Sequence, residues 1–249
     1  MDAKVSEFRE GLGERLPEAL AWLVHLYTAL GVAASLFALI AVYDGRARDM
    51  FWLLGVAILI DGTDGILARR ADVKKWTANF NGRKLDDIID YLNYTFIPVF
   101  FAYRFNLVGD YGVWVLAFVC IASLYGFCSE SAKTDDGYFT GFPSYWNATV
   151  FYMFVLRTPP LFNSALLILL GVMVFVPLKY LYPTQAPSHR LVNIVLAYLW
   201  GFAMIGIMFT FDDPNPIFAS ISLLYAIYYL LASFAANLPK RHLTQTNHK

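Results

Sequence analysis

Charged residues are scarce in this sequence. Asp, Glu, Lys and Arg make up 15% of its 249 residues, whereas soluble domains average about a quarter. Acidic and basic residues are equally numerous, so the formal net charge is zero, which argues against a nucleic-acid partner. The low charge, together with a hydrophobic content of 58%, indicates a membrane protein.

Cysteine is also nearly absent. Cys120 and Cys128 lie eight residues apart in one apolar stretch, a spacing that fits neither a disulfide framework nor a metal site. We interpret both as small hydrophobic residues. No cleavable signal peptide is expected, because charged residues from Lys4 to Arg15 precede the first apolar run.

Long apolar runs dominate the rest of the chain. A bilayer core about 30 Å thick is crossed by roughly twenty apolar residues in a helix. The candidate runs are Ala19–Tyr43, Met50–Ala68, Leu85–Tyr103, Tyr111–Ser131, Tyr145–Leu156, Leu161–Leu181, Leu191–Phe211 and Ile217–Leu238. The fifth run is short and is divided from the sixth by Pro159 and Pro160, which interrupt helices. We expect a single all-α integral membrane domain over residues 1–249, with about eight transmembrane helices, or seven if the fifth run does not cross.

Residues 1–17 differ from these runs. Val5, Phe8, Leu12 and Leu16 recur at helical spacing among charged residues. This pattern predicts an amphipathic N-terminal helix that lies on the membrane surface.

The distribution of Lys and Arg predicts the orientation of the chain. With the N-terminus in the cytoplasm, fifteen of the nineteen fall in inner segments. The four on the other side are Arg46, Arg48, Arg104 and Arg157. We therefore expect both termini, and the loop between the second and third runs, on the cytoplasmic side.

That loop and its flanks gather acidic residues inside apolar runs. Asp61 lies about two turns from the end of its run, and an ionisable residue at such depth is functional by default. Asp61 and Asp64 are about 60° apart on one predicted helix, while Asp86 and Asp90 share a face of the next. If the two faces meet, four carboxylates converge.

Carboxylates this close would repel one another unless cations neutralise them. Ligands that offer only oxygen suit hard cations such as Mg²⁺, Mn²⁺ or Ca²⁺ rather than zinc. Four carboxylates are enough for two ions, a common arrangement for displacement at phosphorus. The sequence therefore predicts a divalent-metal site, against the alternative of a solvated, charged loop.

The same residues resemble the CDP-alcohol phosphotransferase family. Its pattern, D-x-x-D-G-x-x-A-R, a spacer, then G-x-x-x-D-x-x-x-D, is matched at every fixed position by Asp61, Asp64, Gly65, Ala68, Arg69, Gly82, Asp86 and Asp90. One departure is the spacer, residues 70–81, which has twelve residues where the family usually has eight. This longer spacer, and the downstream segment Ala132–Asn147, resemble the branch that uses choline as its acceptor.

The resemblance implies a reaction and a role for each matched residue. The reaction would join CDP-diacylglycerol to choline and release CMP. The enzyme would be a homodimer that lies among the lipids of a bacterial inner membrane. Two Mn²⁺ or Mg²⁺ ions would be held by Asp61, Asp64, Asp86 and Asp90, with Asp90 also acting as the general base. The cytidine diphosphate pocket would be lined by Asp61, Asp64, Gly65, Ala68, Arg69 and Gly82.

Choline recognition can be argued from chemistry. A quaternary ammonium is bound by aromatic faces and negative charge. The candidates near the expected site are Asn93, Tyr94, Glu130, Tyr138, Tyr145 and Trp146. Aromatic residues also gather at membrane interfaces for other reasons, so each of these is a hypothesis. Lys133 is a candidate for a substrate phosphate.

Two alternatives stay open. Within the family, serine, glycerol 3-phosphate or inositol could replace choline without changing the motif. Outside it, the carboxylates could form the ion site of a transporter, although transporters typically show repeats and broken helices.

Overall fold

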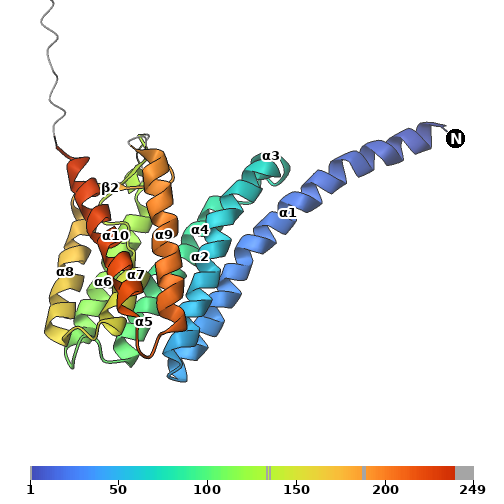
Figure 1. Cartoon of the computed structure of the whole chain (residues 1–249). Helices are drawn as coiled ribbons and strands as arrows, with labels where there is room; N and C mark the ends of the chain where they lie inside the picture. Colours follow the sequence, from blue (N-terminus) through green and yellow to red (C-terminus); the bar gives the residue numbers. More distant parts are fainter. Residues whose placement is uncertain (1, 133, 135, 187–188, 239–249) are drawn as a thin grey trace, which may run out of the picture. The chain divides into compact units, whose positions relative to one another are not determined.

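The computed structural model describes residues 2–132, 134, 136–186 and 189–238 (Figure 1). In chain order the elements are α1 (Asp2–Tyr43), α2 (Ala47–Arg70), α3 (Val73–Trp76), α4 (Gly82–Asp90), the π-helix η1 (Tyr91–Phe96), α5 (Ile97–Arg104), α6 (Gly112–Cys128), the 3₁₀-helix η2 (Glu130–Ala132), β1 (Tyr138–Thr140), α7 (Trp146–Val155), α8 (Pro160–Phe175), β2 (Lys179–Leu181), α9 (Arg190–Phe209) and α10 (Pro216–Ala235). They form two compact units, one of Met1–Phe127 with Ser144–Leu169 and one of Cys128–Pro143 with Leu170–Lys249.

Each predicted apolar run contains helix, but the expected eight spans are not confirmed. Within the described residues, four helical segments are long and apolar enough to cross a membrane: Arg15–Tyr43, Ala47–Arg70, Arg190–Phe209 and Pro216–Ala235. Gly112–Cys128 and Pro160–Phe175 are apolar but shorter. The third run is divided among α4, η1 and α5, which follow one another directly.

Two boundaries and the presence of strands differ from the sequence-based expectation. Residues 2–17 continue without a break into the first apolar run, because Pro17 is accommodated inside α1. The predicted sixth run, by contrast, ends early: α8 stops at Phe175, since Pro177 supplies no backbone N–H and disfavours helix before it. The chain beyond α8 forms β2, which pairs antiparallel with β1. The expectation of an all-α chain is therefore corrected by two strands of three residues each.

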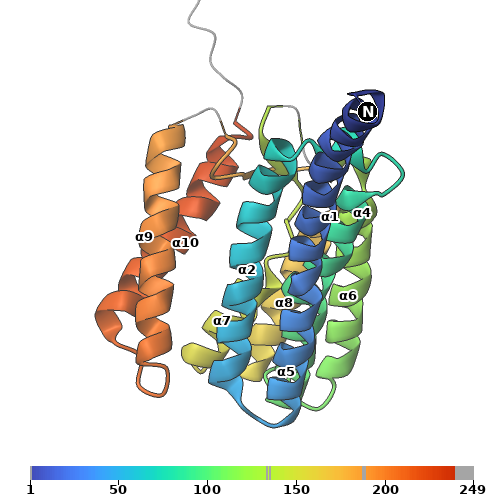
Figure 2. The same cartoon turned by 90° about the vertical axis from the view of Figure 1, so that its right-hand side faces the viewer.

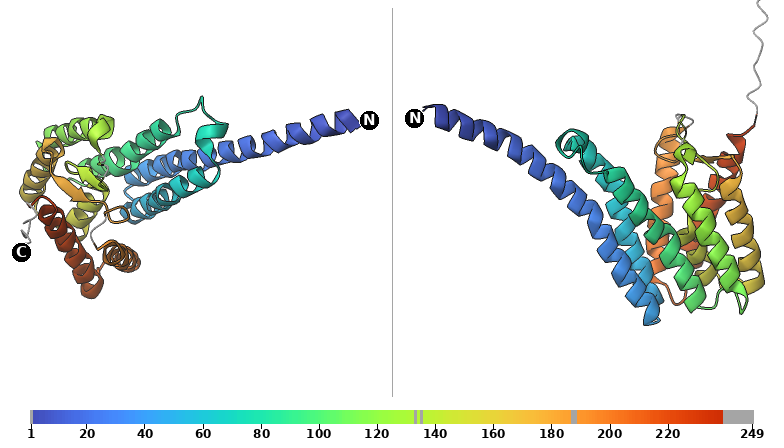
Figure 3. Two further views of the ribbon diagram at one scale, coloured as in Figure 1. Left: turned by 90° about the horizontal axis from the view of Figure 1, so that it is seen from above. Right: turned by 180° about the vertical axis from the view of Figure 1, so that it is seen from behind.

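The first unit is built around α1. Gly45 adopts a left-handed conformation (φ +77°) in the turn between α1 and α2, and the two helices then run side by side (Figure 2). Helix α4 also packs on α1, where Gly31 permits the contact: a Cβ there would lie 2.7 Å from Cγ2 of Ile89. The view from behind in Figure 3 shows α1, α2 and α4 together, with α3 at the end of α2. Both acidic segments of the sequence motif thus lie on helices that contact α1.

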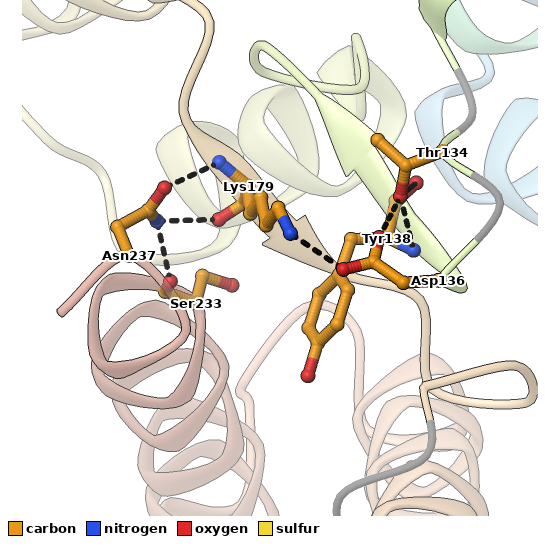
Figure 4. Close-up of polar contacts among 6 residues, drawn as sticks. All are labelled: Thr134, Asp136, Tyr138, Lys179, Ser233 and Asn237. Carbon is orange, nitrogen blue, oxygen red and sulfur yellow. Dashed lines mark hydrogen bonds and ion pairs between the residues drawn. The ribbon is translucent and has the colours of Figure 1, made fainter. Parts of the chain in front are cut away.

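In the second unit, polar contacts join the loop before β1 to β2, and β2 to the end of α10 and to Asn237 just beyond it (Figure 4). Nζ of Lys179 donates to Oδ2 of Asp136 at 2.5 Å, and the backbone of Lys179 exchanges two hydrogen bonds with the side chain of Asn237. The ammonium and hydrogen bonding of Lys179, and then Thr134, lower the pKa of the Asp136 carboxyl. The loop before β1 is therefore tied to β2 by an ion pair at the surface.

Candidate active site

Three of the motif carboxylates lie together in the first unit. One oxygen each from Asp61 on α2 and from Asp86 and Asp90 on α4 lie within 4.8 Å of one another. Asp86 and Asp90 are one helical turn apart, so α4 presents both towards α2. All three side chains are half-buried, and three carboxylate oxygens at this spacing suit a hard divalent cation.

The fourth motif carboxylate is held differently. Asp64 is 7% exposed, and its Oδ2 accepts a hydrogen bond of 2.9 Å from the hydroxyl of Thr28 on α1. It lies beside the cluster of three rather than within it. The hydrogen bond from Thr28 engages only one carboxylate oxygen, so the other oxygen of Asp64 can still act as a metal ligand while Thr28 orients the side chain.

A cleft of about 680 Å³ adjoins these carboxylates. Its volume falls in the range of ligand-binding pockets. Five of the six residues expected to contact cytidine diphosphate line it, namely Asp64, Gly65, Ala68, Arg69 and Gly82, and Asp86 from the carboxylate cluster lines it as well. The remaining wall comes from α1, from residues 72–74 and 77–81, and from Arg83 on α4.

The two motif glycines have different surroundings. A Cβ on Gly65 would lie 3.4 Å from a guanidinium nitrogen of Arg69, which is a contact that a small movement relieves. A Cβ on Gly82 would lie 2.8 Å from Cε1 of His25, a buried side chain. Gly82 therefore makes room for the imidazole of α1 as well as lining the cleft.

Tyr94 connects the carboxylate cluster to the following helix. Its hydroxyl donates a hydrogen bond of 2.7 Å to Oδ2 of Asp61. Tyr94 lies within η1, whose π-helical turns begin directly after Asp90. Short π-helical segments are frequent at functional sites because they redirect side chains. The ring of Tyr145 is 6.2 Å from the ring of Tyr94, which brings a second aromatic face to the same place.

The other choline candidates have varied environments. Asn93 is buried and accepts a hydrogen bond from Ser35, and Trp146 is fully buried with its Nε1 donating to Ser123 at 2.7 Å. In the second unit, Glu130 is exposed and Tyr138 has Nζ of Lys179 5.6 Å from its ring centre. Lys133 lies outside the described residues.

Sequence reasoning missed several residues around the cleft. Thr28 and His25 come from the first apolar run, and Thr77 and Phe80 come from the spacer. The available signal was that His25 and Thr28 interrupt an apolar run one turn apart, on one helical face. That pattern marks a polar face but does not say which other helix it meets.

No protein-family model matches the chain. Individual relatives do match over most of its length, among them phosphatidylcholine synthases from several bacteria. The protein from Legionella pneumophila is 37% identical over 222 residues, which cover 86% of this chain and 87% of the relative. That from Pseudomonas aeruginosa is 38% identical, over 74% of this chain and 77% of its own. That from Borreliella burgdorferi is 32% identical, over 86% and 93%.

Proposed function

Because the chain belongs to the phosphatidylcholine synthase family, whose members are transferases of substituted phosphate groups, we propose that it joins CDP-diacylglycerol to choline and releases CMP. The observation that carries this proposal is the position of three clustered carboxylates beside a cleft lined by the CDP-alcohol motif. The cleft would take the cytidine diphosphate, while the two acyl chains stay in the bilayer.

The donor set fits divalent cations. Asp61, Asp86 and Asp90 would hold them, with Asp64 as a further ligand, and oxygen-only ligands favour Mg²⁺ or Mn²⁺. When bound, these ions neutralise the pyrophosphate and stabilise the negative charge on departing CMP. Arg69, which lines the cleft, would add a positive charge on the nucleotide side.

Asp90 would act as the general base. It accepts the proton of the choline hydroxyl as the choline oxygen bonds to the phosphorus that carries diacylglycerol. The bond from that phosphorus to the CMP oxygen breaks, and CMP leaves. A carboxylate is a weak base, so most of its effect comes from holding the hydroxyl in line with the leaving group.

The choline cation would contact Tyr94 and Tyr145. Both lie in the first unit, and the hydroxyl of Tyr94 reaches a carboxylate of the cluster. Their ring faces and the nearby negative charge are what a quaternary ammonium requires. Trp146 is less suited because its indole is fully buried, and Asn93 is engaged with Ser35 in the core.

The remaining assignments follow from family membership and charge. The protein would lie in a bacterial inner membrane as a homodimer, as a single membrane domain with both termini cytoplasmic. Its first seventeen residues would lie on the membrane surface, and Lys133 would reach a substrate phosphate.

The test uses purified protein in detergent–lipid micelles with CDP-diacylglycerol and Mn²⁺ or Mg²⁺. Release of CMP is followed with choline, serine, glycerol 3-phosphate or inositol, and with Asp90→Asn as the matched variant. Release with choline alone, lost in the variant, is the expected result. Release with another acceptor would overturn the choline assignment, and no release with any acceptor would favour the ion-site alternative.

A further inference from the structure

The twelve-residue spacer of the sequence motif is an ordered wall of the cleft. It forms α3 and a following turn, and most of it lines the cleft, with Asp72, Val73, Lys74, Thr77, Ala78, Asn79, Phe80 and Asn81. The spacer that is longer than the usual family spacing therefore supplies much of the cleft surface.

One buried hydrogen bond fixes this wall to α1. Nε2 of His25 lies 2.8 Å from Oγ1 of Thr77, 52 residues along the chain. The Thr77 hydroxyl donates its proton to the carbonyl of Val73 at 2.7 Å, so Thr77 accepts the bond from His25 and the imidazole carries its proton on Nε2. His25 and Thr77 are each 6% exposed, and a buried polar pair of this kind defines one geometry.

Packing also holds the imidazole. The ring of Phe80 is 4.5 Å from the ring of His25, and the ring of Trp22 is 5.7 Å away. Gly82 also approaches the ring closely, because a Cβ there would collide with the imidazole. His25 thus contacts the spacer through Thr77 and Phe80, and the start of α4 through Gly82.

We infer that His25 and Thr77 are positioning residues that hold the spacer as a preformed wall of the nucleotide cleft, and so set the affinity for the cytidine diphosphate part of the lipid substrate. Neither residue belongs to the carboxylate cluster, so neither takes part in the displacement. A wall that is ordered before binding lowers the entropy cost of closing around the nucleotide. This inference rests on the proposed function.

Thr77→Val tests the hydrogen bond with little change of shape, and Thr77→Ser restores the hydroxyl. We expect Thr77→Val to raise KM for CDP-diacylglycerol, and the Kd for CDP measured by calorimetry, about three- to tenfold, because a hydrogen bond contributes about 0.5–1.5 kcal/mol. We expect kcat to stay within about twofold and Thr77→Ser to return KM towards the wild-type value. His25→Leu and His25→Gln form a second pair, since glutamine keeps a donor.

Tyr27→Phe is the matched control. The Tyr27 hydroxyl also lies 2.8 Å from a threonine hydroxyl, that of Thr63, and links α1 to α2 outside the cleft. We expect it to leave KM and kcat unchanged. A fall in kcat at constant KM, or no rescue by Thr77→Ser and His25→Gln, would overturn the inference. Wild-type protein that neither binds CDP nor releases CMP would instead overturn the proposed function.

Discussion

The hydroxyl of Tyr94 donates a 2.7 Å hydrogen bond to Oδ2 of Asp61, so a residue of η1 orients a carboxylate on α2. Asp61 is one of three carboxylates whose oxygens lie within 4.8 Å of one another. Groups that hydrogen-bond to metal ligands fix their orientation, and their loss typically costs about 10- to 100-fold in metal affinity or activity.

Tyr94→Phe is therefore expected to weaken the response to metal. The concentration of Mn²⁺ that gives half-maximal CMP release should rise about tenfold or more. The Mn²⁺ concentration needed to stabilise the protein in thermal melts should also rise, and this measurement reports metal binding without turnover. Tyr91→Phe is the control, because the Tyr91 hydroxyl donates to the backbone of Cys120 at 3.3 Å, away from the cluster. Equal metal dependence in the two variants would contradict the role of Tyr94.

Asp90→Asn should abolish most of the catalysis. Loss of a general base costs about 10²- to 10⁴-fold in kcat, and the loss of a metal ligand would add to this. Asp87→Asn is the matched control on the same helix, since Asp87 lies outside the cluster. Its Oδ2 is 4.0 Å from Nε of Arg83 in an ion pair at the surface. Single-turnover CMP release would measure both. A small effect at Asp90, comparable with that at Asp87, would contradict its assignment.

Two glycine substitutions would test the close approach of the His25 ring to the backbone of Gly82. Gly82→Ala should destabilise the protein by about 1–3 kcal/mol, because the new methyl group meets a buried ring at 2.8 Å. Gly55→Ala in α2 should be neutral or stabilising, since a Cβ there meets nothing within 4 Å and alanine favours helix. Chemical denaturation in micelles gives both values. If Gly82→Ala is as stable as Gly55→Ala, the imidazole can move and the packing argument is wrong.

Substitutions of two neighbouring aromatic residues should affect choline binding and protein stability separately. Tyr145→Leu should raise KM for choline about 2- to 30-fold, the equivalent of one cation–π contact. Trp146→Phe should leave that KM unchanged and lower the midpoint of thermal unfolding, because it removes a buried donor to Ser123. The opposite pattern would place the choline cation against Trp146.

The Asp136–Lys179 pair should make the second unit acid-sensitive. Because the ion pair lowers the folded-state pKa of Asp136, its stabilisation is present above the ordinary Asp pKa of 3.8 and is lost as pH falls through the lower folded value. The pair is at the surface, so the effect should be no more than about 1 kcal/mol. Thermal melts below pH 4 should show a smaller acid-induced loss in Asp136→Asn than in the wild type. An identical loss in both would show that the pair contributes nothing.

The sequence by itself determined the helical membrane character and the acidic motif. Long apolar runs favour helix in a bilayer, where backbone polar groups must be satisfied within the segment, and the 100° helical turn alone placed Asp86 and Asp90 on one stripe and Asp61 on a stripe of the preceding helix. The motif by itself also indicated the family, since its eight fixed positions are closely spaced and chemically specific.

Only the tertiary structure decided which groups meet those stripes. Helical periodicity states which face a residue occupies but not its partner, so the contacts of Asp64 with Thr28, of Asp61 with Tyr94 and of Thr77 with His25 were not predictable. Burial was likewise undecided, since Trp146 and Tyr145 are adjacent in sequence, yet one is fully buried and the other half-buried. Such outcomes depend on how several helices pack against one another, and a periodic pattern along a single helix carries no information about that packing.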